Sequence, residues 1–181
     1  MAAVGERHLV LIGLMGVGKT TVGRRCAALL GRPFVDVDAL VETTGRRSVP
    51  EIFATDGEAA FRALERTALA DACASPEPLV ISCGGGAMGD PENRRRVRSA
   101  GCVVWLTADP ATLARRVGGA AAGERRPLLA GPDDPAVTLE RLASLRAPAY
   151  EAAAHLTLAT AGRSVDDVAA LVVEELTRCP A

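Results

Sequence analysis

Short runs of apolar, often β-branched residues alternate along the whole chain with longer stretches in which apolar residues recur at helical spacing. Continuous apolar runs of this length are typical of strands that are buried on both faces, as in a parallel sheet. We expect strands at residues 9–12, 33–37, 79–82, 102–106 and 156–159. The alternation of strands and helices predicts a doubly wound α/β domain with helices on both faces of the sheet.

The expected helices are bounded by residues that favour helix ends. We expect helices at residues 19–30, 57–73, 135–145 and 165–176. Gly31 follows the first of these helices, and Ser164 is the expected N-cap of the last. Asp90 and Asp109 each precede a proline, a pair that is typical of an N-cap and the first helical position. No internal repeat is visible, so we expect a single domain over residues 1–181.

Composition and charge narrow the class of protein. Apolar residues make up 49% of the 181 residues and charged residues 24%, which is typical of a soluble globular protein. The formal net charge of −1 gives no general attraction to nucleic acid or to an anionic membrane. The apolar runs are too short to span a membrane, and no signal peptide is visible. We therefore expect a cytoplasmic protein that binds neither nucleic acid nor membrane, and a monomer.

Two other features of composition are less informative about function. The five cysteines are widely spaced and form no CxxC pair, so we expect reduced, buried thiols and no zinc site. The arginine-rich run at 94–98 has no interleaved aromatic residues, and we interpret it as a solvated helix face. Lys19 is the only lysine in the chain, and its neighbours explain why it is present.

Residues 13–20 read Gly-Leu-Met-Gly-Val-Gly-Lys-Thr and fit the pattern G-x-x-x-x-G-K-[ST], between an expected strand and an expected helix. Such a loop directs backbone N–H groups at phosphate oxygens, the lysine reaches the β- and γ-phosphates, and the hydroxyl of Thr20 is offered to Mg²⁺. A GTPase would need a second lysine in Asn-Lys-x-Asp, and an ATPase motor a strand ending in Asp-Glu. Neither is present, so the sequence favours a small-molecule kinase.

Two aspartates, Asp36 and Asp38, follow the second apolar run. Residues two apart on a strand face the same side, so we expect both carboxylates to project at the carboxyl edge of the sheet. There Asp36 would orient Mg²⁺ through a water molecule, and Asp38 would accept the proton of the attacking hydroxyl or align it. The alternative is that both aspartates only cap turns.

Further polar and glycine-rich segments predict a site for the phosphoryl acceptor. Glu58, Arg62 and Glu65 share a helical face, so Arg62 is either a fork for a substrate carboxylate or one member of a solvated ion pair. The glycines at 84–86 follow the third strand and indicate a close approach of the backbone to a ligand. Arg146 lies near a helix end, where a surface arginine is the simpler interpretation.

The glycine- and alanine-rich stretch at 118–123 is expected to be a mobile loop. It precedes Arg125 and Arg126, and a closing lid of this kind would place positive charge on the transferring phosphoryl group. Arg126 is the better candidate, although the sequence does not separate it from its neighbour.

Taken together, these motifs resemble those of the shikimate kinase family over residues 11–163. The resemblance implies a nucleoside-monophosphate-kinase-like core of five parallel strands, and transfer of the ATP γ-phosphoryl group to the 3-hydroxyl of shikimate. It implies a substrate-binding segment at about 38–66 and a lid at about 117–130. It also implies that Lys19, Asp38 and Arg126 are catalytic.

The binding residues that the resemblance implies fall into three groups. Shikimate would contact Asp38, Arg62, Gly84, Gly85, Gly86 and Arg146. ATP would contact Gly16, Val17, Gly18, Lys19, Thr20, Thr21, Arg126 and Arg163, and Mg²⁺ would contact Thr20 and Asp36. The lid is slightly longer than is usual in the family, so Arg116 is a second candidate for the adenine-facing arginine. The loop at 161–165 lacks a proline that is often found there.

Two alternatives stay open at this point. The first is a P-loop kinase of another polyol acid, such as gluconate or an aminoshikimate, because two arginines select an acid without selecting its ring. The second is a nucleotide-binding module with no phosphoryl acceptor, although such a module has no need of the carboxylate of Asp38 beside the γ-phosphate.

Overall fold

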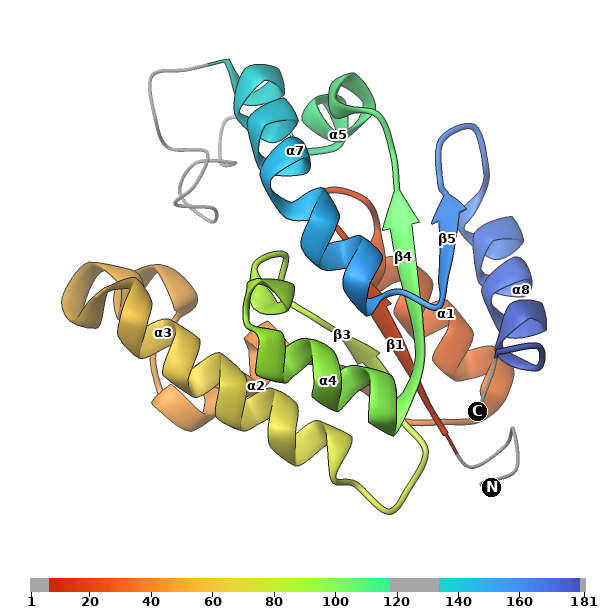
Figure 1. The fold of residues 1–181 in the computed structure, drawn as a ribbon, viewed down its shortest axis with the longest axis horizontal. Helices are drawn as coiled ribbons and strands as arrows, with labels where there is room; N and C mark the ends of the chain where they lie inside the picture. The colour runs from red at the N-terminus through yellow and green to blue at the C-terminus, as the bar shows by residue number, and fades with distance from the viewer. Residues whose placement is uncertain (1–6, 118–133, 180–181) are drawn as a thin grey trace.

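The computed structural model describes residues 7–117 and 134–179, and they form one five-stranded sheet with helices on both faces (Figure 1). The strands are β1 (His8–Ile12), β2 (Phe34–Asp36), β3 (Val80–Ser82), β4 (Gly101–Thr107) and β5 (Leu156–Ala159). They lie in the order β2-β3-β1-β4-β5, and every pair of neighbours is parallel. The doubly wound architecture predicted from the sequence is confirmed.

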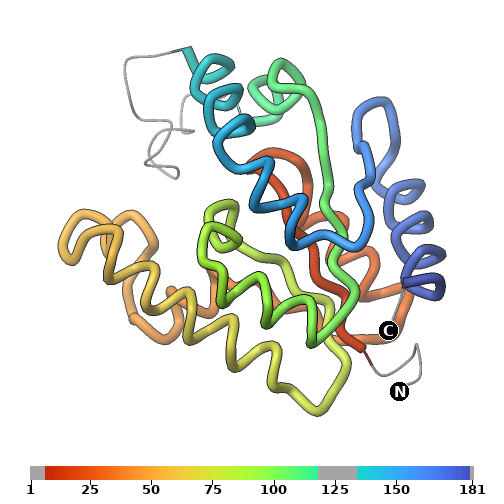
Figure 2. Tube along the Cα trace, viewed as in Figure 1, coloured from red at the N-terminus to blue at the C-terminus, as the bar shows by residue number. Residues whose placement is uncertain are grey.

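The helices cover the two faces in separate groups. The helices are α1 (Lys19–Leu30), α2 (Val37–Gly45), α3 (Val49–Cys73), α4 (Pro91–Ala100), α5 (Pro110–Val117), α7 (Pro135–Ala153) and α8 (Val165–Leu176), with a short 3₁₀ turn, η2 (Ala87–Gly89). Figure 1 shows α4 and α7 in front of the sheet and α1 with α8 behind it. Figure 2 shows the α2–α3 pair to one side, beyond the end of the sheet that β2 forms. None of the helices among the described residues is both long enough and apolar enough to cross a bilayer.

The central strands explain the apolar runs in the sequence. All five residues of β1 are buried, because neighbouring strands flank β1 on both sides and helices cover both of its faces. β5 lies at an edge of the sheet, and its residues alternate between partly buried and exposed. The order of β3, β1 and β4 places the segments that follow these strands side by side at their carboxyl ends, the position in which open α/β sheets bind ligands.

Several helix boundaries agree with the sequence analysis, and others do not. α1 ends before Gly31, and Ser164 caps α8 in a capping box, as predicted. α3 begins at Val49 rather than near Gly57, because Ser48 and Glu51 form a capping box there. Gly57, with φ 81°, interrupts this helix. The sequence analysis also omitted α2, and it ended α7 at residue 145, although that helix continues through an internal proline to Ala153.

The arginine-rich run at 94–98 is more than a solvated face. Arg94 donates a hydrogen bond to the carbonyl oxygen of Met88, at 2.7 Å. Arg98 donates to the carbonyl oxygens of Ala153 and Ala154, at 3.2 and 2.9 Å, and so satisfies the C-terminal end of α7. Two arginines of the run therefore stabilise neighbouring elements.

The expectation of five reduced cysteines is wrong for one pair. Cys102, near the start of β4, and Cys179, after the end of α8, form a disulfide with a Cα–Cα distance of 6.0 Å. The other three cysteines, Cys26, Cys73 and Cys83, are free. The two bonded residues are 77 positions apart, so only the packing of α8 behind the sheet brings them together.

Candidate active site

The loop between β1 and α1 has the conformation that a phosphate-binding loop needs. Gly13 has φ 140°, and a Cβ atom there would lie 2.4 Å from the carbonyl oxygen of Leu106. Gly18 has φ 101° and is the N-cap of α1, where no side chain caps the helix. The first N–H groups of α1 are therefore free of side-chain caps and available to an anion.

Lys19 lies with its ammonium group buried against this loop. Its Nζ donates hydrogen bonds to the carbonyl oxygens of Gly13, at 2.9 Å, and Leu14, at 3.0 Å. Burial lowers the pKa of Lys19 to about 8, and the negative charges of Asp38 and Asp36 act in the opposite direction. The side chain is consequently still mainly a cation at neutral pH, held where the phosphates of a nucleotide would lie.

Asp36 joins this loop to the second strand. It is the last residue of β2 and the N-cap of α2, and its Oδ1 accepts a hydrogen bond from the backbone N–H of Asp38 at 3.1 Å. The hydroxyl of Thr20 donates to Oδ2 of Asp36 at 2.9 Å. The sequence argument placed both aspartates on one strand, and this was wrong: Asp38 lies in the first turn of α2. The turn of the helix, rather than strand alternation, brings its carboxylate to the same cavity.

The carboxylate of Asp38 is strongly affected by its surroundings. Its Oδ1 is buried and has no hydrogen-bond partner. Burial, followed by the negative charges of Asp36 and Glu65, raises the pKa of Asp38 to about 6. Lys19 and Arg62 oppose this rise. A buried acceptor without a donor is suited to receive a hydrogen bond from a bound hydroxyl.

Arg62 is held by two glutamates of its own helix. It pairs with Glu58 at 3.1 Å and with Glu65 at 2.7 Å. The side chain of Glu58 is 61% exposed, whereas that of Glu65 is 2% exposed. Burial raises the pKa of Glu65, and Arg62 acts against that rise. Arg62 therefore has one solvated partner, Glu58, and one buried partner, Glu65, whose carboxylate holds the guanidinium in place.

A single cavity of about 430 Å³ joins these groups. The phosphate-binding loop, Asp38, Arg62 and Arg146 all line it. Of the residues predicted from the sequence, the cavity wall includes Gly16, Gly18, Lys19, Thr20, Thr21, Asp36, Asp38, Arg62, Gly84, Gly85, Gly86 and Arg146. The cavity therefore connects an anion-binding loop to a pair of cations that suit an organic acid.

Known proteins that are similar to this chain in sequence include members of the shikimate kinase family. The family model described as Shikimate kinase matches residues 15–177. A shikimate kinase of Symbiobacterium thermophilum is 49% identical over 169 residues, which cover 93% of this chain and 95% of that protein. One of Caulobacter vibrioides is 46% identical over 157 residues, covering 86% and 76%.

Comparison with solved structures also finds a shikimate kinase. The solved structure of shikimate kinase from Acinetobacter baumannii in complex with shikimate superposes with a TM-score of 0.89 and 34% identity, covering 96% of this chain and 94% of that one. The chain belongs to the shikimate kinase family. Both the family and the ATP-dependent kinase activity predicted from the sequence are confirmed by these matches.

Not every residue predicted for this shikimate kinase site lies in the cavity. Val17 is buried and lines a smaller apolar cavity beside the loop. Arg163 is exposed after β5 and donates to the carbonyl oxygen of Ala159, outside the cavity. Arg116 donates to Thr160, at 2.9 Å, and links α5 to the same segment. Arg125, Arg126 and most of the predicted lid at 117–130 lie outside the described residues.

The structure also adds residues that the sequence analysis did not assign to the site. Phe53 and Phe61 form an apolar wall of the cavity, with ring centroids 4.8 Å apart. Tyr150 is buried in α7 and donates its hydroxyl to the carbonyl oxygen of Gly85. An aromatic residue in a helix is usually part of the core, so nothing in the sequence distinguished Tyr150 from a core residue.

The glycine run leaves room for side chains of the site. A Cβ atom at Gly84 would lie 2.5 Å from Oε1 of Glu65 and 2.7 Å from Oδ1 of Asp38. A Cβ atom at Gly86 would lie 2.3 Å from the guanidinium of Arg62, and one at Gly85 3.0 Å from that of Arg146. We predicted that these glycines allow a ligand to approach the backbone. The contacts observed are with the charged side chains, which occupy the space that Cβ atoms would fill.

These contacts predict the effect of adding one methyl group. Gly84→Ala should lower kcat by about 10-fold or more, because the carboxylates of Asp38 and Glu65 must move while the fold is retained. The matched control is Gly89→Ala in the same segment, where no atom lies within 4 Å of the new Cβ. Steady-state kinetics and the melting temperatures of both variants test this. Equal kcat values for the two variants would contradict the prediction.

Proposed function

We propose that this chain transfers the γ-phosphoryl group of ATP to the 3-hydroxyl of shikimate and forms shikimate 3-phosphate for aromatic amino-acid biosynthesis. One observation carries the proposal: a single cavity is lined by a phosphate-binding loop, by two arginines and by Asp38, whose buried carboxylate oxygen Oδ1 has no hydrogen-bond partner. Membership of the shikimate kinase family supports this assignment.

The nucleotide binds, in this proposal, at the start of α1. The backbone from Gly16 to Thr21 surrounds the phosphates, and Lys19 exchanges its two carbonyl partners for oxygens of the β- and γ-phosphates. The family resemblance adds Val17, Arg126 and Arg163 to the nucleotide contacts, and these three assignments stay predictions. Because Lys19 already lies against the loop, its charge needs only a small movement to reach a bound phosphate.

The acid binds, in this proposal, beside Arg62 and Arg146. Arg62 and Arg146 contact the positions of the adjacent glycines Gly86 and Gly85, which places the two guanidinium groups on one side of the cavity. Two planar forks arranged in this way suit a carboxylate. The backbone of the glycine run at 84–86 and the carboxylate of Asp38 then face the hydroxyl groups of the ring.

Mg²⁺ fits the oxygen ligands beside the phosphate-binding loop. The hydroxyl of Thr20 and the carboxylate of Asp36 are 2.9 Å apart and both line the cavity, and Mg²⁺ prefers oxygen ligands of this kind. Thr20 would hold the ion directly and Asp36 through a water molecule. When bound, Mg²⁺ would supply positive charge that neutralises the phosphate oxygens.

The chain's own residues act by positioning and by charge. Asp38 aligns the attacking hydroxyl and accepts its proton at the unpartnered Oδ1, with a pKa of about 6 that keeps it ionised at neutral pH. Lys19, with Arg126 of the predicted lid, stabilises the charge that develops on the transferred group. No covalent intermediate is needed. In this proposal the substrate-binding segment at 38–66 and the lid at 117–130 belong to a single domain over residues 1–181.

The test is an ADP-release assay with purified protein and Mg²⁺-ATP, across shikimate, gluconate, a nucleoside monophosphate and no acceptor. Shikimate should give the highest kcat/KM, and EDTA should abolish the rate. A preference for gluconate would favour another polyol acid as the substrate. If the protein binds nucleotide but releases no ADP with any of the acceptors, the non-catalytic module would be favoured.

Arg62 gives a test of acid binding. Arg62→Leu should raise KM for shikimate by about 10- to 100-fold with a smaller change in kcat, because a charge-assisted fork is lost from substrate binding. The matched control is Arg66→Leu on the same helix, whose guanidinium pairs instead with Asp90 and does not line the main cavity. An unchanged KM in Arg62→Leu would exclude Arg62 from substrate binding.

Expectations about partners and location also belong to this proposal. We infer that the chain acts as a cytoplasmic monomer that binds ATP and shikimate and neither nucleic acid nor membrane. The near-zero formal charge supports the part on nucleic acid. Size-exclusion chromatography with light scattering tests the monomer: a mass of 18.7 kDa is expected, and a multiple of it would contradict the proposal.

A further inference from the structure

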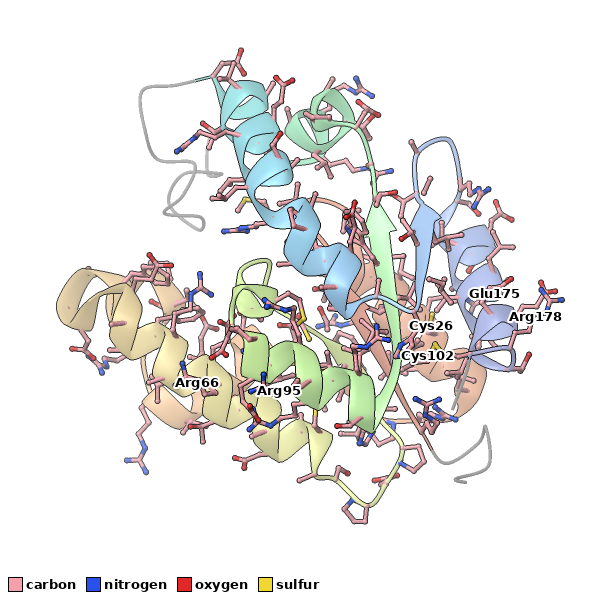
Figure 3. All side chains as sticks on the ribbon, in the orientation of Figure 1. Cys26, Arg66, Arg95, Cys102, Glu175 and Arg178 are labelled. Atoms are coloured by element: carbon pink, nitrogen blue, oxygen red, sulfur yellow. A yellow bond between two sulfur atoms is a disulfide. The ribbon has the colours of Figure 1, made fainter. Side chains whose placement is uncertain are left out.

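A second cluster of reactive side chains lies away from the kinase cavity. Sulfur atoms of Cys102 and Cys179 and a ring nitrogen of His155 all lie within 4.8 Å of one another, and none of the three residues lines that cavity. Cys102 is the second residue of β4, whereas the kinase cavity lies at the carboxyl ends of the strands. Figure 3 shows Cys102 on the side of the molecule where α8 lies.

The hydrogen bonding of His155 distinguishes between a metal site and a thiol site. Its Nδ1 accepts a hydrogen bond from the backbone N–H of Val103 at 3.0 Å. A neutral ring in this arrangement carries its proton on Nε2, and so has no free lone pair for a metal ion. Burial, followed by the charges of Arg98 and Arg7, lowers the pKa of His155 and keeps the ring neutral. The ring therefore offers one N–H donor, at Nε2.

Two arginines give this corner of the sheet a positive charge. Arg7 donates to the carbonyl oxygen of Gly101, the residue before Cys102, at 3.2 Å. Arg98 donates to the carbonyl oxygen of Ala154, the residue before His155, at 2.9 Å. Guanidinium groups and an N–H donor both stabilise a thiolate relative to a thiol. A sulfur released from the disulfide is therefore in favourable surroundings.

The two cysteines of the disulfide differ in their exposure to solvent. Cys102 is completely buried in β4, whereas Cys179 is partly exposed and follows the end of α8. A thiol from solution can therefore attack Cys179, with Cys102 as the leaving group. The leaving sulfur belongs to the residue after Gly101, whose carbonyl oxygen accepts a hydrogen bond from Arg7.

We propose that Cys102 and Cys179, assisted by His155, form a reversible thiol–disulfide site whose reaction partners are small thiols and disulfides such as glutathione. In reduction, a glutathione thiolate attacks Sγ of Cys179, the disulfide breaks, and its electron pair leaves on Sγ of Cys102 as a thiolate. A second glutathione thiolate attacks the glutathione sulfur of the mixed disulfide and releases Cys179. Two glutathione thiols are thus oxidised to one disulfide while the two cysteines are reduced.

The oxidation state of this site controls how firmly α8 is held. α8 packs behind the sheet against α1, the helix that begins with Lys19: Asp166 pairs with Arg25 at 2.6 Å, and the thiol of Cys26 contacts the carbonyl oxygen of Ala169 at 3.8 Å. The disulfide joins the chain after α8 to the start of β4 across 77 positions. Opening a loop of this length restores much conformational freedom to the unfolded chain.

The first experiment measures thiols and melting temperature in buffers of oxidised or reduced glutathione. Of the five cysteines, three thiols should be titrated after denaturation of the oxidised protein and five after denaturation of the reduced protein. The melting temperature of the reduced protein should be lower by on the order of 10 °C, with little change in kinase activity at 25 °C. Cys179→Ser should remove the redox dependence of the melting temperature, and Cys73→Ser, at a free cysteine, should retain it.

The second experiment isolates the role of His155. In His155→Asn, the amide oxygen replaces Nδ1 as acceptor for the N–H of Val103, and the Nε2–H is lost. The rate constant for reduction by glutathione should fall several-fold, while the melting temperature of the oxidised form changes little. His155→Gln, whose amide can supply a donor near the position of Nε2, should recover part of the rate.

Several outcomes would overturn the proposal. Five thiols in the protein equilibrated with oxidised glutathione would show that no disulfide forms, and three thiols in excess reduced glutathione would show that it is not reversible. An unchanged reduction rate in His155→Asn would remove the histidine from the site. If Zn²⁺ instead stabilised the reduced wild type but not Cys179→Ser, the cluster would be a metal site.

Discussion

Lys19→Ala is expected to lower kcat by about 10³-fold or more, while the protein remains folded. The ammonium group of Lys19 is buried beside the phosphate-binding loop, and its pKa of about 8 keeps it mainly charged at neutral pH. Loss of this charge removes a cation that would bind the β- and γ-phosphates and stabilise the charge that develops on the transferred group. The chain has no second lysine to replace it.

The measurement combines steady-state kinetics with a melting curve for each variant. Lys19→Ala leaves the carbonyl oxygens of Gly13 and Leu14 without their present partner, so a small fall in melting temperature is expected as well. The matched control is Arg24→Ala on the same helix, whose guanidinium lies 5.7 Å from the ring of Phe34 and does not line the cavity. Wild-type turnover in Lys19→Ala would refute the catalytic role of the lysine.

Asp38→Asn is expected to lower kcat by about 10²-fold or more. The neutral amide cannot accept the proton of the attacking hydroxyl, and it aligns that hydroxyl without the negative charge of the carboxylate. In the wild type, kcat/KM should fall roughly tenfold per pH unit below a pH of about 6, because burial and the charges of Asp36 and Glu65 raise the pKa of Asp38 to that value. In Asp38→Asn this loss at low pH should be weaker. A rate–pH profile of both proteins decides the matter, and equal rates at neutral pH would remove Asp38 from the mechanism.

The same raised pKa predicts a gain in stability in this variant. The pKa of Asp38 is higher in the folded protein than its ordinary value of 3.8, so its contribution to stability is fully present below pH 3.8 and is lost as pH rises through about 6. Above that pH the wild type holds a buried charge that Asp38→Asn lacks. The variant should therefore melt several degrees higher at pH 8, and the difference should disappear near pH 4.

The stability measurement separates catalysis from folding. A variant that melts higher and turns over more slowly places Asp38 among residues whose strained surroundings serve the reaction. Asp36→Asn is the matched control, since that side chain already accepts hydrogen bonds from Thr20 and from the backbone of α2. Its replacement should lower the melting temperature and raise the Mg²⁺ concentration needed for activity. A lower melting temperature for Asp38→Asn at pH 8 would contradict the sign derived above.

Much of the fold follows from local properties of the chain. The strand expected at 156–159 is β5 itself, and α1 has the bounds that the position of Gly31 predicted. Burial on both faces leaves a continuous apolar run, and helix caps involve residues only a few positions apart. The sequence analysis missed α2 and the first part of α3. β2 has only three residues, and its apolar pattern continues into the first turn of α2, so the helix was not distinguished from the strand.

The sequence alone determined the parts of the site that are contiguous. The phosphate-binding loop, with Lys19 and Thr20, is a run of eight residues whose function depends on their order, so the pattern was sufficient to predict its chemistry. The ion pairs of Arg62 followed from helical spacing. The resemblance of the motifs to one family then supplied Arg146, which its own neighbours did not distinguish from a surface residue.

Only the tertiary structure decided which distant side chains meet, and what each experiences there. Glu65 and Asp38 converge on Gly84, Tyr150 of α7 contacts Gly85, and Cys102 meets Cys179 from 77 positions away. The reason is physical: burial, electric field and contact depend on distance through space, which the packing of helices on the sheet sets. Spacing along the chain constrains such distances only over a few turns of helix or residues of strand.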